Sequence, residues 1–239
     1  MQQLPLELRL ADFAVMETFF PGNNAAAVYA LEQIARVESR AVIWLWGATG
    51  TGKTHLLQAA VHAGDQAGSR CAYLPLGPGA DLLPDALEGM GELDLICIDD
   101  IHAVAGRGDW ETGLFALYER LRARGERLVM AADRAPLHVE FALPDLVSRF
   151  SSGATFRLTS LTDDEKVSAM QLRAAWRGLT LPDDTARFII SRVDRQSRSL
   201  FDLLDRLDRA ALAAQRKLTV PFVRSILETS SPAARLSEE

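Results

Sequence analysis

The chain has 239 residues, enough for one large domain or a core domain with a small satellite, and its composition is 48% hydrophobic and 24% charged. The formal net charge of -6 disfavours a broad nucleic-acid-binding surface. The two cysteines argue against a disulfide framework and indicate a reducing, cytoplasmic compartment, and we expect neither a signal peptide nor a membrane-spanning segment.

The first 160 residues alternate short apolar runs with helical segments. Residues 1–10 are expected to form an extended arm, and Asn24 is placed to cap the first helix after a turn at 19–24. The apolar runs lie at 41–46, 70–76, 93–98, 127–132 and 154–158. Because continuous apolar strands separated by helices are typical of a sheet covered on both faces, we predict an α/β fold with a parallel five-stranded sheet between helices.

The pattern becomes helical after residue 158. Residues 162–165 form a capping-box sequence, so a helix is expected to begin there and to end near Gly178. Further helices are expected at 182–194, along an apolar stripe from Leu200 to Ala214, and after Thr219, which is placed to cap the last one. These elements predict a small all-helical lid domain.

Residues 47–54, with the sequence GATGTGKT, match the P-loop pattern G-x-x-x-x-G-K-[ST] between an apolar run and a helical segment. The loop N–H groups and the helix N-terminus can surround phosphates. Lys53 can reach the β- and γ-phosphates, and the Thr54 hydroxyl can hold Mg²⁺. The residues expected to hold ATP or ADP are Gly47, Thr49, Gly50, Thr51, Gly52, Lys53 and Thr54.

Asp99 and Asp100 follow the apolar run 93–98, and open α/β sheets bind ligands at the carboxyl ends of their strands. We expect Asp99 to orient Mg²⁺, partly through water, and Asp100 to polarise a water molecule. An Asp-Asp pair alone is equally typical of a turn. The upstream P-loop favours the catalytic interpretation.

Three further residues are candidates on weaker grounds. Asp133 ends the run 127–132, where it can contact the γ-phosphate region or cap a turn. Arg149 lies in the last turn of a short helix, and Arg198 begins a long one. Residue type and spacing alone leave these arginines as partners of a helix dipole or of surface ion pairs.

Residues 11–229 resemble an AAA+ ATPase module of the DnaA type. The resemblance is carried by the P-loop, by residues 98–101 as Walker B, by Asp133 and Arg134 as sensor 1 and by Arg198 as sensor 2. We expect neither the N-terminal oligomerisation domain of the initiator nor its helix-turn-helix DNA-binding domain. Within the family the chain is most similar to the regulators that inactivate DnaA, through residues 3–8, 143–149 and 215–223.

The resemblance implies that the N-terminal segment docks into the peptide pocket of the DNA polymerase III sliding clamp, the beta subunit. The residues implied to contact the clamp are Gln3, Leu4, Leu6 and Leu8. Gln3 can present a two-sided amide, the leucines can fill an apolar groove, and Pro5 favours an extended arm that loses less entropy on docking. DNA would be contacted only through the clamp, and no membrane is involved.

The resemblance also assigns Arg149 as an arginine finger that enters the ATP site of DnaA in trans, with Arg198 as the sensor that contacts this chain's own nucleotide. The implied function is regulatory. Docked on the clamp, the protein stimulates hydrolysis of DnaA-bound ATP and so prevents re-initiation of chromosome replication. Its own ATP turnover is expected to be weak, and head-to-tail packing of AAA+ modules leaves a homo-oligomer open.

The expected organisation is a clamp-binding arm at 1–10, a nucleotide-binding α/β domain at 11–160, a helical lid at 161–229 and a disordered tail at 230–239. Two other functions stay open. The intact P-loop favours a stand-alone AAA+ ATPase that acts as a helicase loader or initiator-like assembly factor. An adaptor that tethers DnaA-like partners without affecting hydrolysis is the third interpretation.

Overall fold

The computed structural model describes residues 14–37, 41–192, 197–214 and 217–229. The chain divides between Ser160 and Leu161 into two compact units. The first unit has an α/β architecture, and the second contains helices without strands among its described residues.

The α/β unit is built on a five-stranded sheet whose neighbouring strands are all parallel, as the sequence predicts. The strand order is β2-β3-β4-β1-β5. The strands are β1 (Val42–Trp46), β2 (Cys71–Pro75), β3 (Leu95–Asp99), β4 (Arg127–Ala132) and β5 (Ala154–Arg157). Parallel pairing brings the carboxyl ends of the strands to one edge, which is where this architecture binds ligands.

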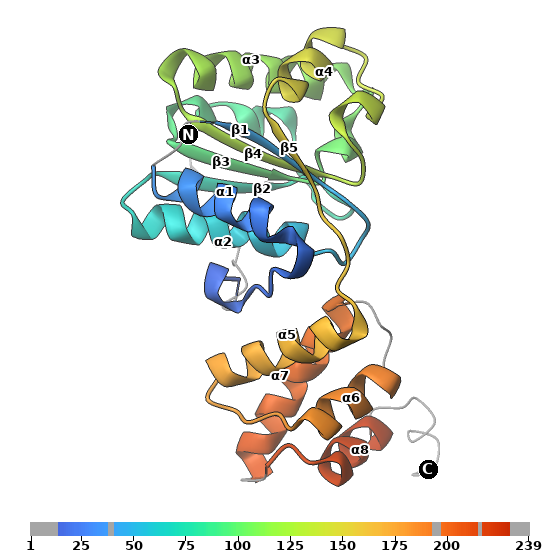
Figure 1. Ribbon diagram of the computed structural model, residues 1–239. Coiled ribbons are helices and arrows are strands. Elements are labelled where there is room, and N and C mark those ends of the chain that lie inside the picture. Colours follow the sequence, from blue (N-terminus) through green and yellow to red (C-terminus); the bar gives the residue numbers. More distant parts are fainter. Residues whose placement is uncertain (1–13, 38–40, 193–196, 215–216, 230–239) are drawn as a thin grey trace. The chain divides into compact units, whose positions relative to one another are not determined.

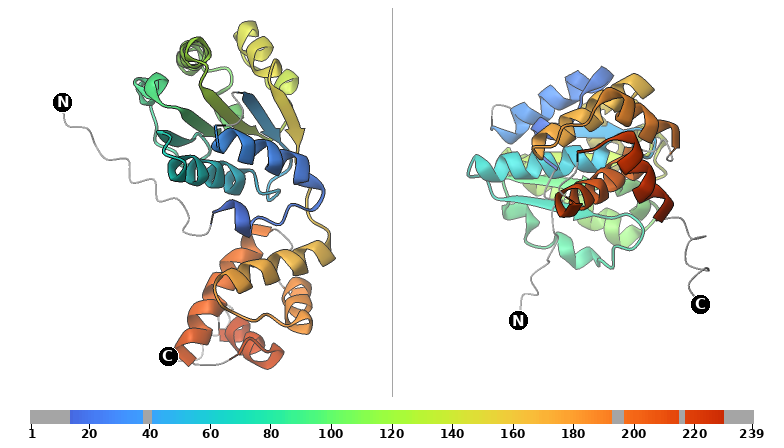
Figure 2. Two further views of the ribbon diagram at one scale, coloured as in Figure 1. Left: turned by 60° about the vertical axis from the view of Figure 1, so that its left-hand side comes forward. Right: turned by 90° about the horizontal axis from the view of Figure 1, so that it is seen from below.

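Helices cover both faces of the sheet (Figures 1 and 2). One face carries α1 and α2, and the other carries α3 and α4. Their bounds are α1 (Ala25–Ala35), α2 (Lys53–Gln66), α3 (Gly108–Arg124) and α4 (Pro144–Ser151). Alternate residues of β1 enter the two cores, because successive strand side chains point to opposite faces. Leu45 packs in the core with α1 and α2, whereas Trp44 packs in the core with α3 and α4.

The second unit contains α5 (Asp163–Trp176), α6 (Asp183–Arg192), α7 (Ser197–Ala214) and α8 (Val220–Thr229). The predicted capping box is confirmed at the start of α5. The Glu165 backbone N–H donates to the Thr162 hydroxyl at 3.3 Å, and the Thr162 N–H donates to the Glu165 carboxylate at 2.8 Å. Buried apolar residues of all four helices form a separate core, including Met170, Ile189, Leu204 and Val223.

The predicted capping role of Asn24 is wrong. Asn24 occupies the position before α1, but its side chain makes no capping bond there. Instead its Oδ1 accepts from the Thr159 N–H at 2.8 Å, and its Nδ2 donates to the Thr159 carbonyl at 3.0 Å. This buried, two-sided pairing satisfies both ends of the amide, which one capping bond cannot do.

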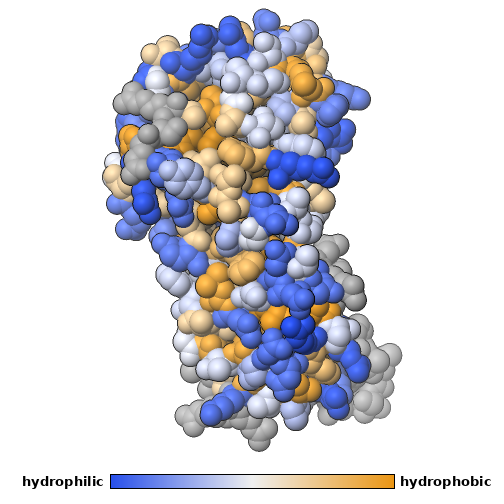
Figure 3. Space-filling model, in the orientation of Figure 1, coloured by the Kyte–Doolittle hydropathy of each residue, from blue (hydrophilic) through white to orange (hydrophobic). Residues whose placement is uncertain are grey.

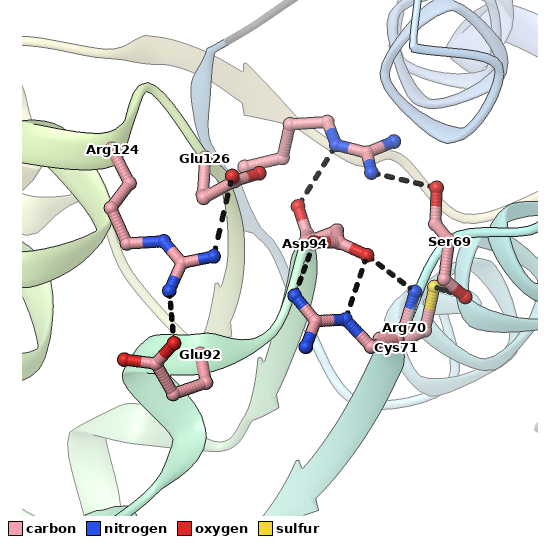
Figure 4. A network of polar contacts seen from close by, with 8 residues as sticks. Ser69, Arg70, Cys71, Glu92, Asp94, Arg124 and Glu126 are labelled. Atoms are coloured by element: carbon pink, nitrogen blue, oxygen red, sulfur yellow. Dashed lines mark hydrogen bonds and ion pairs between the residues drawn. The ribbon is translucent and has the colours of Figure 1, made fainter.

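A buried arginine ties together the amino edge of the sheet, opposite the ligand edge. Arg127 opens β4 and is 2% exposed. Its guanidinium donates to the Asp94 carbonyl at 2.9 Å, the Ile34 carbonyl at 2.7 Å and the Ser69 hydroxyl at 2.8 Å. Figure 4 shows the Asp94 carboxylate beside the Arg70 guanidinium, with Ser69 next to Arg70. Arg70 pairs with the Asp94 carboxylate at 3.0 Å and lowers the pKa of that carboxyl group.

None of the described helices combines the length and apolar character needed to cross a membrane. On the face viewed in Figure 3, hydrophilic residues are interspersed with hydrophobic ones in both units.

Candidate nucleotide-binding site

The P-loop connects β1 to α2 at the carboxyl edge of the sheet. Gly52 has a left-handed backbone with φ of 93°, and a Cβ there would lie 2.6 Å from the Phe19 ring. A Cβ on Gly47 would lie 2.5 Å from the Leu158 carbonyl oxygen. The buried Thr51 hydroxyl donates to the Ala48 carbonyl at 2.9 Å, which closes the loop on itself. The glycines are therefore required by space as well as by backbone conformation.

Lys53 lies within this loop, at the start of α2. Its Nζ donates to the Gly47 carbonyl at 2.7 Å and to the Ala48 carbonyl at 3.1 Å. Burial lowers the pKa of Lys53, while the nearby carboxylates of Asp100, Asp99 and Asp133 raise it. All three predicted acidic residues therefore favour the charged form of the P-loop lysine.

Thr54 and Asp99 are brought together because α2, the helix that follows the P-loop, packs against β3. The Thr54 hydroxyl donates to Asp99 Oδ2 at 2.6 Å. Asp99 is 3% exposed, and burial raises the pKa of its carboxyl group. A hydroxyl and a carboxylate are the hard oxygen ligands that suit Mg²⁺, so these two residues would hold the ion.

Tyr73 on β2 is a site residue that the sequence analysis missed. Its hydroxyl donates to the same Asp99 Oδ2 at 2.9 Å, and burial raises the pKa of the phenol. Tyr73 pairs in register with Cys97, two residues before Asp99 and on the same face of the sheet. The contact depends on β2 lying beside β3, and no local motif in the sequence encodes that adjacency.

Replacing Tyr73 by phenylalanine is expected to weaken Mg²⁺-dependent nucleotide binding roughly tenfold, because a hydrogen bond to a charged group is worth ~1.5 kcal/mol. Nucleotide binding without Mg²⁺ should change little. Titration of ADP with and without Mg²⁺ tests this. Tyr118→Phe is the matched control, since it removes a hydroxyl that contacts Ser152 instead. Equal Mg²⁺-dependent affinity in Tyr73→Phe and the wild type would contradict the assignment.

Asp100 follows Asp99 with a left-handed backbone, at φ of 51°. Its carboxylate approaches the loop after β2 closely, because a Cβ on Gly77 would lie 2.5 Å from Asp100 Oδ2. A non-glycine residue in this region costs free energy, and such residues cluster at functional sites. Asp100 therefore lies against the loop after β2, and its backbone N–H donates to Asp99 Oδ1 at 3.1 Å.

Asp133 follows β4 at the same edge of the sheet. Arg134 donates to both oxygens of its carboxylate, at 2.8 and 2.7 Å, and lowers the pKa of Asp133. His102 Nδ1 lies 4.0 Å from the same carboxylate. The Asp133 carboxylate raises the pKa of Lys53 and is itself paired with Arg134.

The segment before α1 packs over the P-loop helix. The Phe19 ring lies 5.4 Å from the imidazole of His55, which follows Thr54. His55 Nε2 lies 2.9 Å from the Val15 carbonyl oxygen. The residues around Phe19 predict only a turn, because nothing local indicates this long-range contact.

Arg149 is not among the residues gathered at the P-loop. It lies on α4, on the sheet face opposite α2, and its Nε is 3.1 Å from Glu119 Oε1. Its side chain is 39% exposed. Arg198 lies in α7 of the second unit, and its side chain is outside the described residues. The predicted clamp contacts Gln3, Leu4, Leu6 and Leu8 also lie outside them.

A P-loop after β1, a carboxylate at the end of β3 and a helical second unit define the chain as a P-loop ATPase of the AAA+ class. Residues 85–157 match the family model of the bacterial DnaA ATPase domain, and residues 163–227 match that of the Hda lid domain. The chain is therefore an Hda-like protein of the DnaA family of AAA+ ATPases.

Solved structures share the fold. Domain III of the replication initiation protein DnaA from Thermotoga maritima is 22% identical, with a TM-score of 0.75 over 92% of this chain and 97% of that one. The AMPPCP-bound DnaA from Aquifex aeolicus is 21% identical, with a TM-score of 0.69 over 83% and 66%. The RuvB Holliday junction branch migration motor from Thermotoga maritima is 20% identical, with a TM-score of 0.63 over 87% and 68%.

Proposed function

We propose that this protein regulates the replication initiator DnaA by stimulating hydrolysis of the ATP that DnaA holds. Arg149 carries the proposal. This arginine is half-exposed, lies apart from the chain's own P-loop cluster and is paired on the surface with Glu119. At this exposed position the guanidinium can contact a partner protein. The match of the second unit to the Hda lid domain supports DnaA as that partner.

The chemistry asked of Arg149 is electrostatic. As water attacks the γ-phosphate of the partner's ATP, negative charge spreads over the phosphate oxygens, and a guanidinium at hydrogen-bond distance stabilises it. An arginine provides a planar set of donors that fits this geometry, which lysine does not. The reaction then requires no acid or base from Arg149, only its placement in the partner's site.

The chain's own nucleotide, ADP or ATP with Mg²⁺, has a separate place in the proposal. Lys53 would contact its phosphates, and Thr54 with Asp99 would hold the ion. Arg198 would contact the same nucleotide from the lid. Bound there, the nucleotide stabilises the fold and the active form by preferential binding. The regulatory effect on DnaA is independent of its turnover.

The N-terminal arm would supply the location. Gln3, Leu4, Leu6 and Leu8 would dock on the sliding clamp, so the protein acts on DnaA where replication has just taken place. An extended peptide with apolar anchors and one amide is a common recognition mode. Contact with DNA is then made by the clamp, consistent with the net charge of -6.

The experiment that tests this proposal follows radiolabelled ATP bound to purified DnaA, mixed with this protein and with clamp loaded on DNA. Conversion to ADP should require both the protein and the clamp. The double substitution of Gln3 and Leu4 by alanine should remove clamp binding and the clamp-dependent part of the conversion. If the folded, nucleotide-bound protein produces no conversion, the regulatory proposal is rejected.

One observation favours a second candidate, a stand-alone ATPase acting as a helicase loader or initiator-like factor. Lys53, Thr54 and Asp99 are assembled as an ATPase requires. Steady ATP turnover by this protein alone, in the same experiment without DnaA, would support that candidate.

A further inference from the structure

The helix that carries Arg149 is packed firmly against α3. Phe150 is 1% exposed, and its ring lies 6.1 Å from that of Tyr118 on α3. The Tyr118 hydroxyl lies 3.4 Å from the Ser152 hydroxyl just after α4. The two helices therefore have a fixed relation to each other within the α/β unit.

The start of α4 is fixed by a second set of contacts. Glu111 of α3 is fully buried, and its carboxylate accepts from the backbone N–H groups of Gly106, Ala142 and Leu143. Leu143 immediately precedes α4. The hydrogen bonds of Glu111 fix the residues before α4, and the buried Phe150 ring fixes its end. The position of α4 therefore does not depend on surface contacts.

Glu119 is the residue on α3 that reaches Arg149. Its Oε1 lies 3.1 Å from Arg149 Nε, and both side chains are partly exposed. Glu119 Oε2 lies 3.9 Å from Arg122, one turn further along α3. The contact with Arg149 is therefore an ion pair, and its nearest guanidinium atom is Nε, the nitrogen next to the aliphatic stem.

We propose that Glu119 is a positioning residue for Arg149. The ion pair restricts where the guanidinium lies, so that it is already placed when the phosphate of a partner's nucleotide approaches. An arginine side chain has many rotamers, and holding it before the partner arrives reduces the ordering required in the complex. This inference rests on the proposed function, because it assigns Arg149 the role of the trans arginine.

The test compares single-turnover hydrolysis of DnaA-bound ATP by Glu119→Ala, Glu119→Gln and Arg149→Ala variants of the full chain. Glu119→Ala should lower the rate at saturating protein roughly tenfold, because a misplaced catalytic group costs one to two orders of magnitude. The protein concentration for half-maximal rate should not change. Glu119→Gln keeps the size of the side chain but removes the charge that attracts the guanidinium, so it should be impaired in the same way as Glu119→Ala.

Glu92→Ala is the matched control. Glu92 also pairs with an arginine of α3, Arg124, but makes no contact with Arg149. A second readout does not depend on DnaA. The chemical shift of Arg149 Nε, assigned by the loss of its signal in Arg149→Ala, should change in Glu119→Ala and stay the same in Glu92→Ala.

The outcomes separate the two proposals. If Arg149→Ala retains full stimulation, the proposed function fails and the inference fails with it. If Arg149→Ala abolishes stimulation while Glu119→Ala matches the wild type, the inference alone is overturned. A Glu119→Ala rate above the wild type would also overturn it, because the pair would then withhold Arg149 rather than place it.

Discussion

Replacing Arg149 by alanine is expected to lower the stimulated hydrolysis of DnaA-bound ATP by ~10³-fold or more, since arginine fingers contribute ~10³–10⁵ to the rate in GTPases. The side chain is partly exposed and its pair with Glu119 lies at the surface, so the protein should remain folded. Single-turnover conversion of labelled ATP on DnaA, at saturating protein and clamp, measures the effect.

Two substitutions make this result specific. Arg149→Lys keeps a positive charge but loses the planar set of donors, and it should remain strongly impaired. Arg70→Ala removes another partly exposed arginine paired with a carboxylate, that of Asp94, and should retain full stimulation. Normal stimulation by Arg149→Ala would leave the regulatory proposal without its catalytic residue.

Replacing Arg127 by alanine is expected to lower the free energy of unfolding by about 3–5 kcal/mol, because each buried acceptor left without its donor costs about 1–3 kcal/mol. The substitution leaves the Ile34 and Asp94 carbonyls and the Ser69 hydroxyl without this donor in a buried place. Urea unfolding followed by tryptophan fluorescence would report it, because Trp44 and Trp110 are buried in the same unit.

The control is again Arg70→Ala, which removes the exposed arginine of the same network, so the unfolding midpoint should hardly change. Arg127→Ala should still bind ADP when folded, because Arg127 lies at the edge opposite the P-loop. An unchanged unfolding midpoint for Arg127→Ala would show that these bonds contribute no net stability.

The elements that could be predicted are those whose signals are local. The apolar run 127–132 is β4, and Thr162 with Glu165 forms the capping box, because both depend on residues that are adjacent in sequence. The strand order β2-β3-β4-β1-β5 depends on pairing between distant segments, and no periodicity encodes it. The two hydrogen bonds of the Asn24 side chain with Thr159 could not be predicted for the same reason, because the local pattern indicates only a helix cap.

The candidate site divides in the same way. The P-loop pattern places Lys53 and Thr54 by itself, and Asp99 follows from the rule that ligands bind at the carboxyl ends of strands. The bond from Tyr73 to Asp99 and the pair of Glu119 with Arg149 each join two elements across the fold. Such contacts require three-dimensional packing, so composition and spacing could not reveal them.

The bond between Asn24 and Thr159 also bears on how the α/β unit is made. The two residues are 135 positions apart, so their pairing closes a loop that contains almost the whole unit. Closing so long a loop costs chain entropy that must be offset by contacts formed at the same time. During synthesis, the segment before α1 therefore cannot form its hydrogen bonds with Thr159 until β5 has left the ribosome.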